Sequence, residues 1–235
     1  MKRFSSVLFD LDGTLLPMDL KEFTDAYFSL LLGRLAKNGF DAKRAAHAIQ
    51  SGIVRMVAND GSASNETAFW RAFEQSYGPL QDGDTLIFEA FYREEFPKLK
   101  GVCGFDPRAA LCVEQARKVA HRVILATNPL FPATATEQRA EWSGCPVSAF
   151  DHYTTFENAS FSKPNPEYYK EILAKEGLKA EECLMVGNDV DEDMIAATLG
   201  MKVFLLTPCL INKKGLPIDD FPHGDFEALL AFLKA

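Results

Sequence analysis

Two aspartates, Asp10 and Asp12, directly follow the short apolar run Val7–Phe9. The run is typical of a buried strand, and Asp12-Gly13 is typical of the tight turn that ends a strand. Residues two positions apart in a strand point to the same face, so the two carboxylates would lie side by side and repel each other unless a cation or a shared proton intervenes. A divalent metal would supply that cation. The alternative is that Asp12-Gly13 serves only as a turn.

Polar residues also follow two later apolar runs. Thr127-Asn128 follows RVILA, and the hydroxyl and amide could donate hydrogen bonds to an oxyanion. The acidic cluster Asn188–Asp193 follows CLMVG, and Lys163 lies in the loop FSKPNPEYY. The alternatives are a turn before a helix, a solvated lysine, and the first turn of a helix beginning near Asp191, where the helix dipole favours acids. Together these groups could form a phosphate site.

The elements that would position these residues alternate between helix and strand. The sequence predicts helices over residues 108–120, 134–142, 165–177 and 193–200, and strands over 122–128, 183–189 and 202–207. This alternation indicates an α/β fold with a mostly parallel sheet, which includes the first strand, and helices on both faces. Ligands gather at the carboxyl ends of the strands in such sheets, and the polar groups fall there.

Between the first strand and the alternating region, residues 20–96 have a helical pattern. Apolar side chains recur every three or four positions, as at Phe23, Tyr27 and Leu31. Ser64 or Asn65 is a candidate helix N-cap, and Gly78-Pro79 is a candidate helix end. We therefore expect an inserted block of some four helices.

Composition limits the class of protein and of partner. The chain has 235 residues, of which 47% are hydrophobic and 25% are charged, as expected for a soluble globular protein. The formal net charge of -8 argues against nucleic acid or an anionic membrane as the main partner. Apolar runs of membrane-spanning length are lacking, and Asp10 comes too early for a signal peptide, so we expect a cytoplasmic protein. We expect a monomer or a homodimer. Five cysteines without a C-x-x-C pair indicate reduced thiols and no zinc site.

The ordered set of motifs resembles that of the haloacid dehalogenase-like (HAD) hydrolase superfamily over nearly the whole chain. The matching segments are Asp10-Leu11-Asp12-Gly13-Thr14-Leu15 for the first motif (D-x-D-G-T-[LV]), Thr127 for the second, Lys163 for the third, and Gly187-Asn188-Asp189 through Asp193 for the fourth. The resemblance implies a Rossmann-like core formed by residues 1–17 and 98–235. It also implies a helical cap of the family's first type, formed by residues 18–97.

The resemblance further implies a phosphatase that acts with Mg²⁺ on a small phosphorylated metabolite. Asp10 would be the nucleophile that forms an aspartyl-phosphate. Asp12 would protonate the leaving alcohol and then deprotonate the attacking water, while its backbone carbonyl ligates the metal. Mg²⁺ suits such an all-oxygen site.

The remaining motif residues would neutralise and hold the phosphoryl group. By the same resemblance, Lys163 would offset the negative charge of Asp10 and of the phosphoryl oxygens. The Thr127 hydroxyl and the backbone N–H groups of Leu11 and Asn128 would bind those oxygens, because phosphoryl transfer to a carboxylate requires the charge to be neutralised before attack.

The fourth motif departs from the pattern G-D-x-x-x-x-D of many relatives. Counting back from Asp193 with four intervening residues reaches Asn188, and counting with three reaches Asp189. A carboxylate binds Mg²⁺ better than an amide does, so we expect Asp189 to be the main ligand and Asn188 a second contact. Asp193 would orient Lys163 or a metal-bound water.

Asp12 favours hydrolysis of phosphate monoesters, because a leaving alcohol needs a proton. The alternatives are a phosphomutase, another HAD phosphotransferase, and a non-catalytic binding or regulatory protein on the same fold. By the resemblance, the cap recognises the leaving group. Its candidate residues are Arg55 and the polar loop Asn59–Asn65, which could reach over a core site or be a solvated surface loop.

Overall fold

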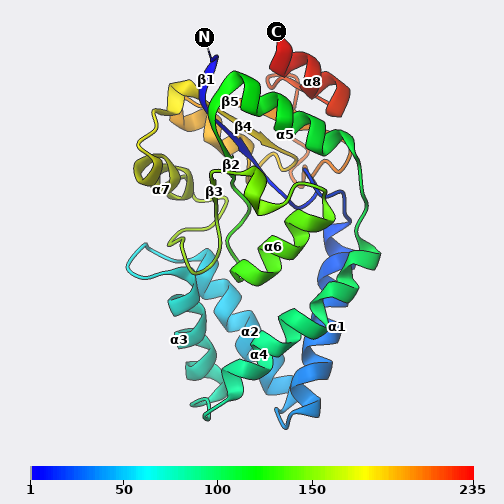
Figure 1. The fold of residues 1–235 in the computed structure, drawn as a ribbon. Helices are drawn as coiled ribbons and strands as arrows, with labels where there is room; N and C mark the ends of the chain where they lie inside the picture. Colours follow the sequence, from blue (N-terminus) through cyan, green and yellow to red (C-terminus); the bar gives the residue numbers. More distant parts are fainter. Residues whose placement is uncertain (1) are drawn as a thin grey trace.

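The computed structural model describes residues 2–235 as an α/β fold (Figure 1). At its centre is a six-stranded sheet with the strand order β3-β2-β1-β4-β5-β6. All neighbouring strands pair in parallel, which confirms the predicted mostly parallel sheet. The strands are β1 (Phe4–Phe9), β2 (Ala120–Leu125), β3 (His152–Tyr153), β4 (Cys183–Gly187), β5 (Lys202–Leu206) and β6 (His223–Gly224).

Strand β1 occupies the middle of the sheet. Phe9 at its end lies opposite Leu125 of β2 and Val186 of β4. The chain builds one side of the sheet through β2 and β3 and then returns to place β4, β5 and β6 on the other side. In sheets of this kind ligands bind at the carboxyl ends of the strands where the order reverses. The segments that follow β1, β2 and β4 therefore meet at one edge.

Helices cover both faces of the sheet. Val7 and Phe9 of β1 belong to the apolar cluster that contains α5, α6 and α8, whereas Leu8 belongs to the cluster that contains α7. This alternation is that of a strand buried on both faces. The helices are α5 (Arg108–Val119), α6 (Ala133–Trp142), α7 (Pro166–Glu176) and α8 (Phe226–Lys234), with short 3₁₀ helices η2 (Val147–Ala149), η3 (Ala180–Glu182) and η4 (Met194–Leu199).

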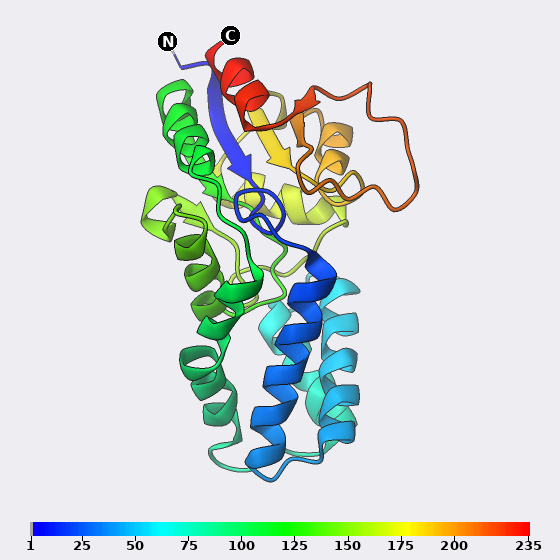
Figure 2. The same cartoon turned by 90° about the vertical axis from the view of Figure 1, so that its right-hand side faces the viewer.

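A block of helices, coloured blue to green, lies beyond the carboxyl edge of the sheet (Figures 1 and 2). Its elements are α1 (Leu20–Lys37), α2 (Ala42–Val57), α3 (Asn65–Tyr77), α4 (Asp84–Glu94) and the 3₁₀ helix η1 (Phe96–Val102). The side chains of Asp19, Asp41 and Ser64 cap the first three helices by accepting backbone hydrogen bonds. The helices predicted between residues 20 and 96 are thus present, and they are inserted between β1 and β2.

An aromatic cluster joins this helical block to the core. The ring of Phe131, which follows β2, packs against Tyr27 at 5.2 Å, Phe96 at 6.3 Å and Phe23 at 6.4 Å between centroids. Edge-to-face and tilted aromatic pairs at these distances add to the free energy gained from burying the rings. The segment that leads into α6 is therefore packed directly against α1 and η1.

The structure differs from the predicted elements in a few places. The predicted strand over 122–128 begins and ends earlier, as β2, so that residues 126–128 lie outside the strand. The predicted helix over 193–200 is the short 3₁₀ helix η4, and residues 191–193 form a turn rather than a first helical turn at Asp191. The two-residue strands β3 and β6 were not predicted, because they are too short to carry a two-residue alternation.

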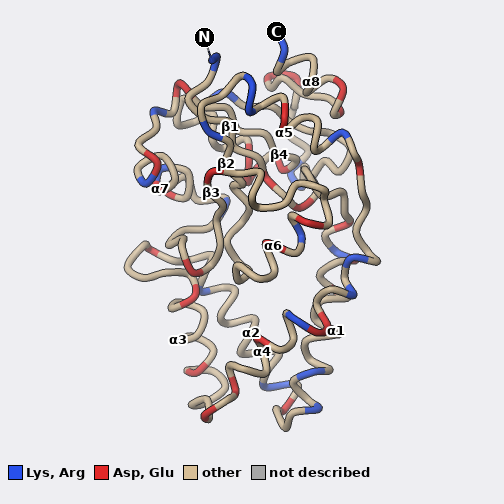
Figure 3. Tube along the Cα trace, in the orientation of Figure 1, with Lys and Arg blue, Asp and Glu red and all other residues tan. Residues whose placement is uncertain are grey.

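Charged residues are spread over the molecule. Acidic and basic residues occur both in the helical block and around the sheet (Figure 3). The five cysteines are free thiols, and burial raises the pKa of Cys112 to about 12. None of the helices within residues 2–235 combines the length and the apolar character needed to cross a membrane.

Candidate active site

Asp10 extends the pairing of β1 by one residue. Its backbone N–H donates to the carbonyl of Val186 at 2.9 Å, and its Oδ2 accepts a 3.0 Å hydrogen bond from Thr14 Oγ1. The following turn uses a positive φ of 82° at Gly13, where an added Cβ would lie 2.4 Å from Asn188 Nδ2. Glycine is needed here for both the backbone conformation and the close approach. The turn therefore packs against the end of β4.

Lys163 comes from the loop before α7 and lies almost completely buried, with 1% of its surface exposed. Its Nζ donates to Asp10 Oδ1 at 2.8 Å and to Asp193 Oδ1 at 2.7 Å. Burial alone would lower the pKa of Lys163, but the two carboxylates outweigh that effect and raise the pKa well above its usual value. A charged lysine thus connects the first, third and fourth motifs.

Asp193 reaches Lys163 because β4 ends in a glycine. A Cβ added to Gly187 would lie 2.1 Å from Asp193 Oδ2, which leaves no room for any other residue. The same oxygen accepts a 3.0 Å hydrogen bond from the backbone N–H of Asp189. Asp193 is therefore fixed at both oxygens.

Thr127 and Asn128 follow β2 beside Asp10. The Thr127 carbonyl accepts hydrogen bonds from Thr154 Oγ1 at 2.7 Å and from the Tyr168 hydroxyl at 2.8 Å. The Asn128 side chain accepts from the backbone N–H of Lys163 at 3.2 Å. Within residues 2–235 the Thr127 hydroxyl and the backbone N–H of Asn128 donate no hydrogen bond, so both remain available to an anionic ligand.

The two side chains of the fourth motif have different partners. Asn188 Oδ1 lies 2.9 Å from the Thr14 hydroxyl, whose single proton it shares with Asp10 Oδ2, and Asn188 Nδ2 donates to the carbonyl of Cys209 at 2.6 Å. Asp189 Oδ1 instead accepts from two backbone N–H groups of the following turn, at 2.8 and 2.9 Å. The amide oxygen of Asn188 is thus closely linked to Asp10, and one oxygen of Asp189 is used to form the turn.

Asp12 has a partner that was not predicted from the sequence. Its Oδ2 forms an ion pair with Arg139 Nη1 from α6, and its Oδ1 is buried without a hydrogen-bond partner. Burial raises the pKa of Asp12, and the positive charge of Arg139 opposes this rise. A signal was present, because Arg139 stands four residues after Ala135 and three before Trp142, on the apolar face of a predicted helix. A charged residue on such a face indicates a buried partner.

The proposed specificity residues occupy two different positions. Arg55 is exposed on α2 and lines a small cleft with Arg71 and Gln75 of α3, and no contact joins it to Asp10. The loop from Asn59 to Asn65, in contrast, contacts the core. Asn65 is fully buried and its Nδ2 donates to the carbonyl of Pro129 at 3.2 Å and to Ser162 Oγ at 3.1 Å. These partners directly follow Asn128 and directly precede Lys163.

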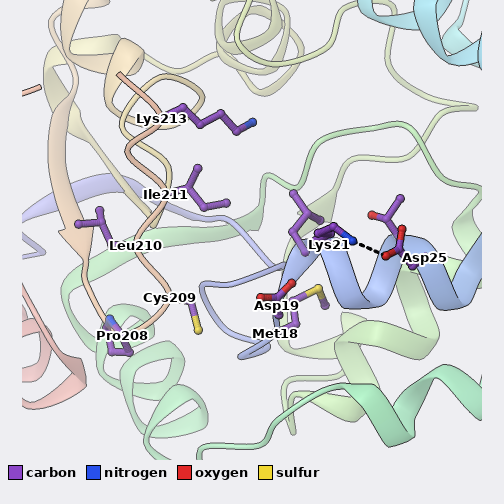
Figure 4. Close-up of a pocket in the computed structure, with 11 residues that line it drawn as sticks. Met18, Asp19, Lys21, Asp25, Pro208, Cys209, Leu210, Ile211 and Lys213 are labelled. Carbon is purple, nitrogen blue, oxygen red and sulfur yellow. Dashed lines mark hydrogen bonds and ion pairs between the residues drawn. The ribbon is translucent and has the colours of Figure 1, made fainter. Parts of the chain in front are cut away.

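An open cavity of about 700 Å³ lies between the start of α1 and the loop after β5 (Figure 4). Lys21 and Asp25 line its α1 side, where they form a 2.6 Å ion pair, and Cys209 and Lys213 line its core side. The segment on one side follows Asp12, and the loop on the other side holds the Asn188 amide through the Cys209 carbonyl. A ligand in this cavity would contact both the helical block and the core.

Comparison with known proteins identifies related enzymes. The family model of haloacid dehalogenase-like hydrolases matches residues 4–199. The chain is 28% identical over 213 residues to the ribulose-1,5-bisphosphate 5-phosphatase of Halopiger xanaduensis, covering 87% of this chain and 85% of that protein. It is 35% identical over 77 residues to the glyceraldehyde 3-phosphate phosphatase of Methanothermobacter thermautotrophicus, a match to only 29% of this chain and about a third (34%) of that enzyme.

Solved structures share the fold. The HAD hydrolase YfnB of Bacillus subtilis, bound to magnesium, superimposes with a TM-score of 0.57 at 19% identity, with 100% of both chains covered. A HAD phosphatase of Thermococcus onnurineus gives the same TM-score of 0.57 and identity of 19%, covering 99% of this chain and 98% of that one. At this level of identity the likeness concerns the fold and not the substrate.

Proposed function

Because the chain belongs to the haloacid dehalogenase-like hydrolase family, we propose that it hydrolyses small phosphate monoesters with Mg²⁺ through an aspartyl-phosphate on Asp10. The observation that carries this proposal is the buried Lys163 ammonium group that contacts both Asp10 and Asp193. Such a cation neutralises charge where an anionic nucleophile must approach an anionic phosphoryl group. The relatives named as phosphatases support the same reaction class.

Both carboxylate oxygens of Asp10 are held by hydrogen bonds. Lys163 binds its Oδ1 and the Thr14 hydroxyl binds its Oδ2, so the carboxylate cannot rotate freely. The phosphoryl oxygens would be bound by the Thr127 hydroxyl and by the backbone N–H groups of Leu11 and Asn128. None of these three groups donates a hydrogen bond within the described part of the chain, so they are free to do this. Preorganised donors of this kind stabilise charge that develops during the transfer.

Asp12 is proposed as the general acid and then the general base. Its unpartnered Oδ1 is suited to give a proton to the leaving oxygen of the ester and later to take one from the water that attacks the aspartyl-phosphate. Burial raises the pKa of Asp12, which favours the protonated form that the first step needs.

The oxygen ligands fit Mg²⁺. Among residues 2–235 no three His, Cys, Asp or Glu side chains are grouped to hold a metal, which is not the pattern of a dedicated protein cage. Mg²⁺ retains several waters and needs only one or two carboxylates, so Asp10, the Asp12 carbonyl, and Asn188 or Asp189 would hold it. The bound ion would neutralise phosphoryl charge and orient the group. We propose that Asp193 acts on the same site through Lys163.

The helical block is proposed to be a cap, formed by residues 18–97, that contacts the leaving group. The core supplies the reacting groups, so substrate selection falls to the block and to the loop Asn59–Asn65 docked beside Lys163. Arg55 would take part only if the block moved toward the site. The named substrates of the relatives are glyceraldehyde 3-phosphate and ribulose 1,5-bisphosphate, so we propose phosphorylated sugars and related polyols as the class to screen.

Turnover of p-nitrophenyl phosphate and of a panel of phosphorylated sugars tests the proposal. Asp10→Asn should lower the rate by at least about 100-fold, because it removes the nucleophile without removing packing. Glu227→Gln, which changes an exposed acid on α8 outside the open cavity beside α1, should keep the wild-type rate. An Asp10→Asn variant that retains more than a few per cent of the activity would exclude Asp10 as the nucleophile, and a phosphorylated product other than inorganic phosphate would indicate a mutase.

A further inference from the structure

Arg139 on α6 is fully buried, with 0% of its side chain exposed. Its Nη1 pairs with Asp12 Oδ2, and its Nε and Nη2 lie 3.3 Å from the Ala135 carbonyl and 3.4 Å from Thr136 Oγ1. An arginine is rarely buried to this extent unless its charge is paired. The pairing with Asp12 is therefore the feature that accounts for a charged residue at this position.

The ring of Phe131 also contacts the guanidinium group. The carbon of the guanidinium lies 4.4 Å from the centre of the Phe131 ring, a cation–π distance. Phe131 in turn packs against Tyr27 of α1 and Phe96 of η1. The Arg139 side chain is thus fixed by its own helix and by the cluster that joins the helical block to the core.

The hydrogen bond to Arg139 makes the two oxygens of Asp12 unequal. A guanidinium group only donates hydrogen bonds and does not lose its proton, so Oδ2 must remain an acceptor. A proton carried by Asp12 must then be on Oδ1, the oxygen that is buried without a partner. This is the oxygen that a leaving group would have to reach.

We propose that Arg139 is a positioning residue that holds Asp12 so that Oδ1 faces the ester oxygen of the substrate. The inference rests on the proposed function of Asp12. In the first step an oxygen of Asp10 forms a bond to phosphorus as the P–O bond of the ester breaks. The electron pair of the broken bond stays on the leaving oxygen, and that oxygen takes the proton from Oδ1. In the second step water forms a bond to phosphorus and gives a proton to Oδ1, while the bond between Asp10 and phosphorus breaks and its electron pair returns to the Asp10 carboxylate. Arg139 gives up no proton in either step.

The test compares two aryl phosphates of similar size, phenyl phosphate and p-nitrophenyl phosphate, in single-turnover release of the phenol. The p-nitrophenolate ion leaves without help from an acid, whereas phenolate is the poorer leaving group and needs protonation. Arg139→Met should slow the release of phenol by about 10- to 100-fold more than the release of p-nitrophenol. General acid catalysis contributes about 10²- to 10⁴-fold in total, and loss of positioning should remove only a part of it. KM should change by less than about threefold, because Arg139 contacts Asp12 and not the phosphate.

Three further variants separate a positioning role from a structural one. Arg139→Lys should recover part of the phenyl phosphate rate, and Gln138→Met, on the same helix but bonded to the Tyr92 carbonyl, should leave the ratio of the two rates unchanged. In an Asp12→Asn background, Arg139→Met should lower the rate with phenyl phosphate by less than about a further twofold, because the effects of two residues that act as one unit do not add. If Arg139→Met does not fold, the ratio of the two rates is measured in two other variants. One is the double variant with Asp12→Asn, in which no unpaired carboxylate remains, and the other is Arg139→Lys.

The outcomes distinguish this inference from the proposed function. Equal slowing of both substrates by Arg139→Met, or its full additional effect in the Asp12→Asn background, would overturn the positioning role alone. A wild-type protein that hydrolyses neither aryl phosphate nor any member of the sugar phosphate panel would overturn the proposed function itself.

Discussion

Replacing Lys163 with methionine would leave the carboxylates of Asp10 and Asp193 without the ammonium group that both of them contact. Lys163 and Asp193 are each 1% exposed and Asp10 is 7% exposed, so water cannot take over the role of the lysine. Methionine has a similar length and keeps most of the packing of the aliphatic chain. The change therefore isolates the loss of the charge.

The expected cost follows from the burial of the pair. Removing one partner of a buried ion pair typically destabilises a protein by about 3–5 kcal/mol, because an uncompensated charge remains. Here two carboxylates at 2.7 and 2.8 Å lose the same cation, so we expect a value toward the upper end of that range at neutral pH. The loss of folding free energy is limited because one of the two carboxylates can take up a proton and lose its charge.

Urea unfolding followed by circular dichroism, in the presence of a chelator, measures this free energy. The matched control is Lys170→Met on α7, whose ion pair with Glu167 is about half exposed, at 53% and 46%, and is worth at most about 1 kcal/mol. Adding Asp193→Asn to Lys163→Met should recover part of the lost stability, because it removes one of the two unpaired charges. A Lys163→Met cost below about 1 kcal/mol, with an unchanged urea dependence, would refute the conclusion that Lys163 neutralises the site.

Two other variants test the metal ligands and the docked loop. Asn188→Ala should raise the Mg²⁺ concentration needed for the half-maximal rate by at least about tenfold, and by more than Asp189→Ala does. A roughly tenfold loss of metal affinity is typical even for residues that only hydrogen-bond a metal ligand. The reason is that the Asn188 amide oxygen shares the Thr14 hydroxyl with the nucleophile, whereas Asp189 Oδ1 is bonded to the turn. A larger shift for Asp189→Ala in magnesium titrations would instead support Asp189 as the main ligand, as expected from the stronger binding of Mg²⁺ by a carboxylate. Asn65→Ala should lower the free energy of unfolding by about 1–3 kcal/mol and raise KM, because buried partners lose their hydrogen bonds. Asn38→Ala, an exposed cap on α1, is its control in the same unfolding and kinetic measurements, and equal effects would contradict a special role for the docked loop.

Much of the site follows from the order of motifs along the chain. Parallel strands end at one edge of a sheet, so residues that follow β1, β2 and β4 must lie near one another whatever their separation in sequence. This is why Asp10, Thr127 and Asn188 could be expected together. Lys163 lies in a loop, and its contact with Asp10 came from the resemblance rather than from any periodicity.

Contacts made by single side chains across the fold could not be predicted in this way. Arg139 lies 127 residues from Asp12 in sequence, and its pairing depends on the direction in which α6 crosses the edge of the sheet. The docking of Asn65 likewise depends on how α2 and α3 approach the core. Patterns of hydrophobicity specify which face of a helix is buried, but not which polar group it meets there.

The helical block contacts the core beside both of the cations at the site. On one side the contact is made by Ser162, which directly precedes Lys163 in the chain. Its Oγ accepts a hydrogen bond from Asn65 at 3.1 Å and donates one to the carbonyl of Met56 in α2 at 3.2 Å. On the other side Phe131 packs between the aromatic residues of α1 and the guanidinium group of Arg139. Lys163 bonds the first aspartate of the first motif, and Arg139 bonds the second. A shift of the block would therefore act on both carboxylates through their cations, so residues that set its position can alter the chemical steps as well as the choice of substrate.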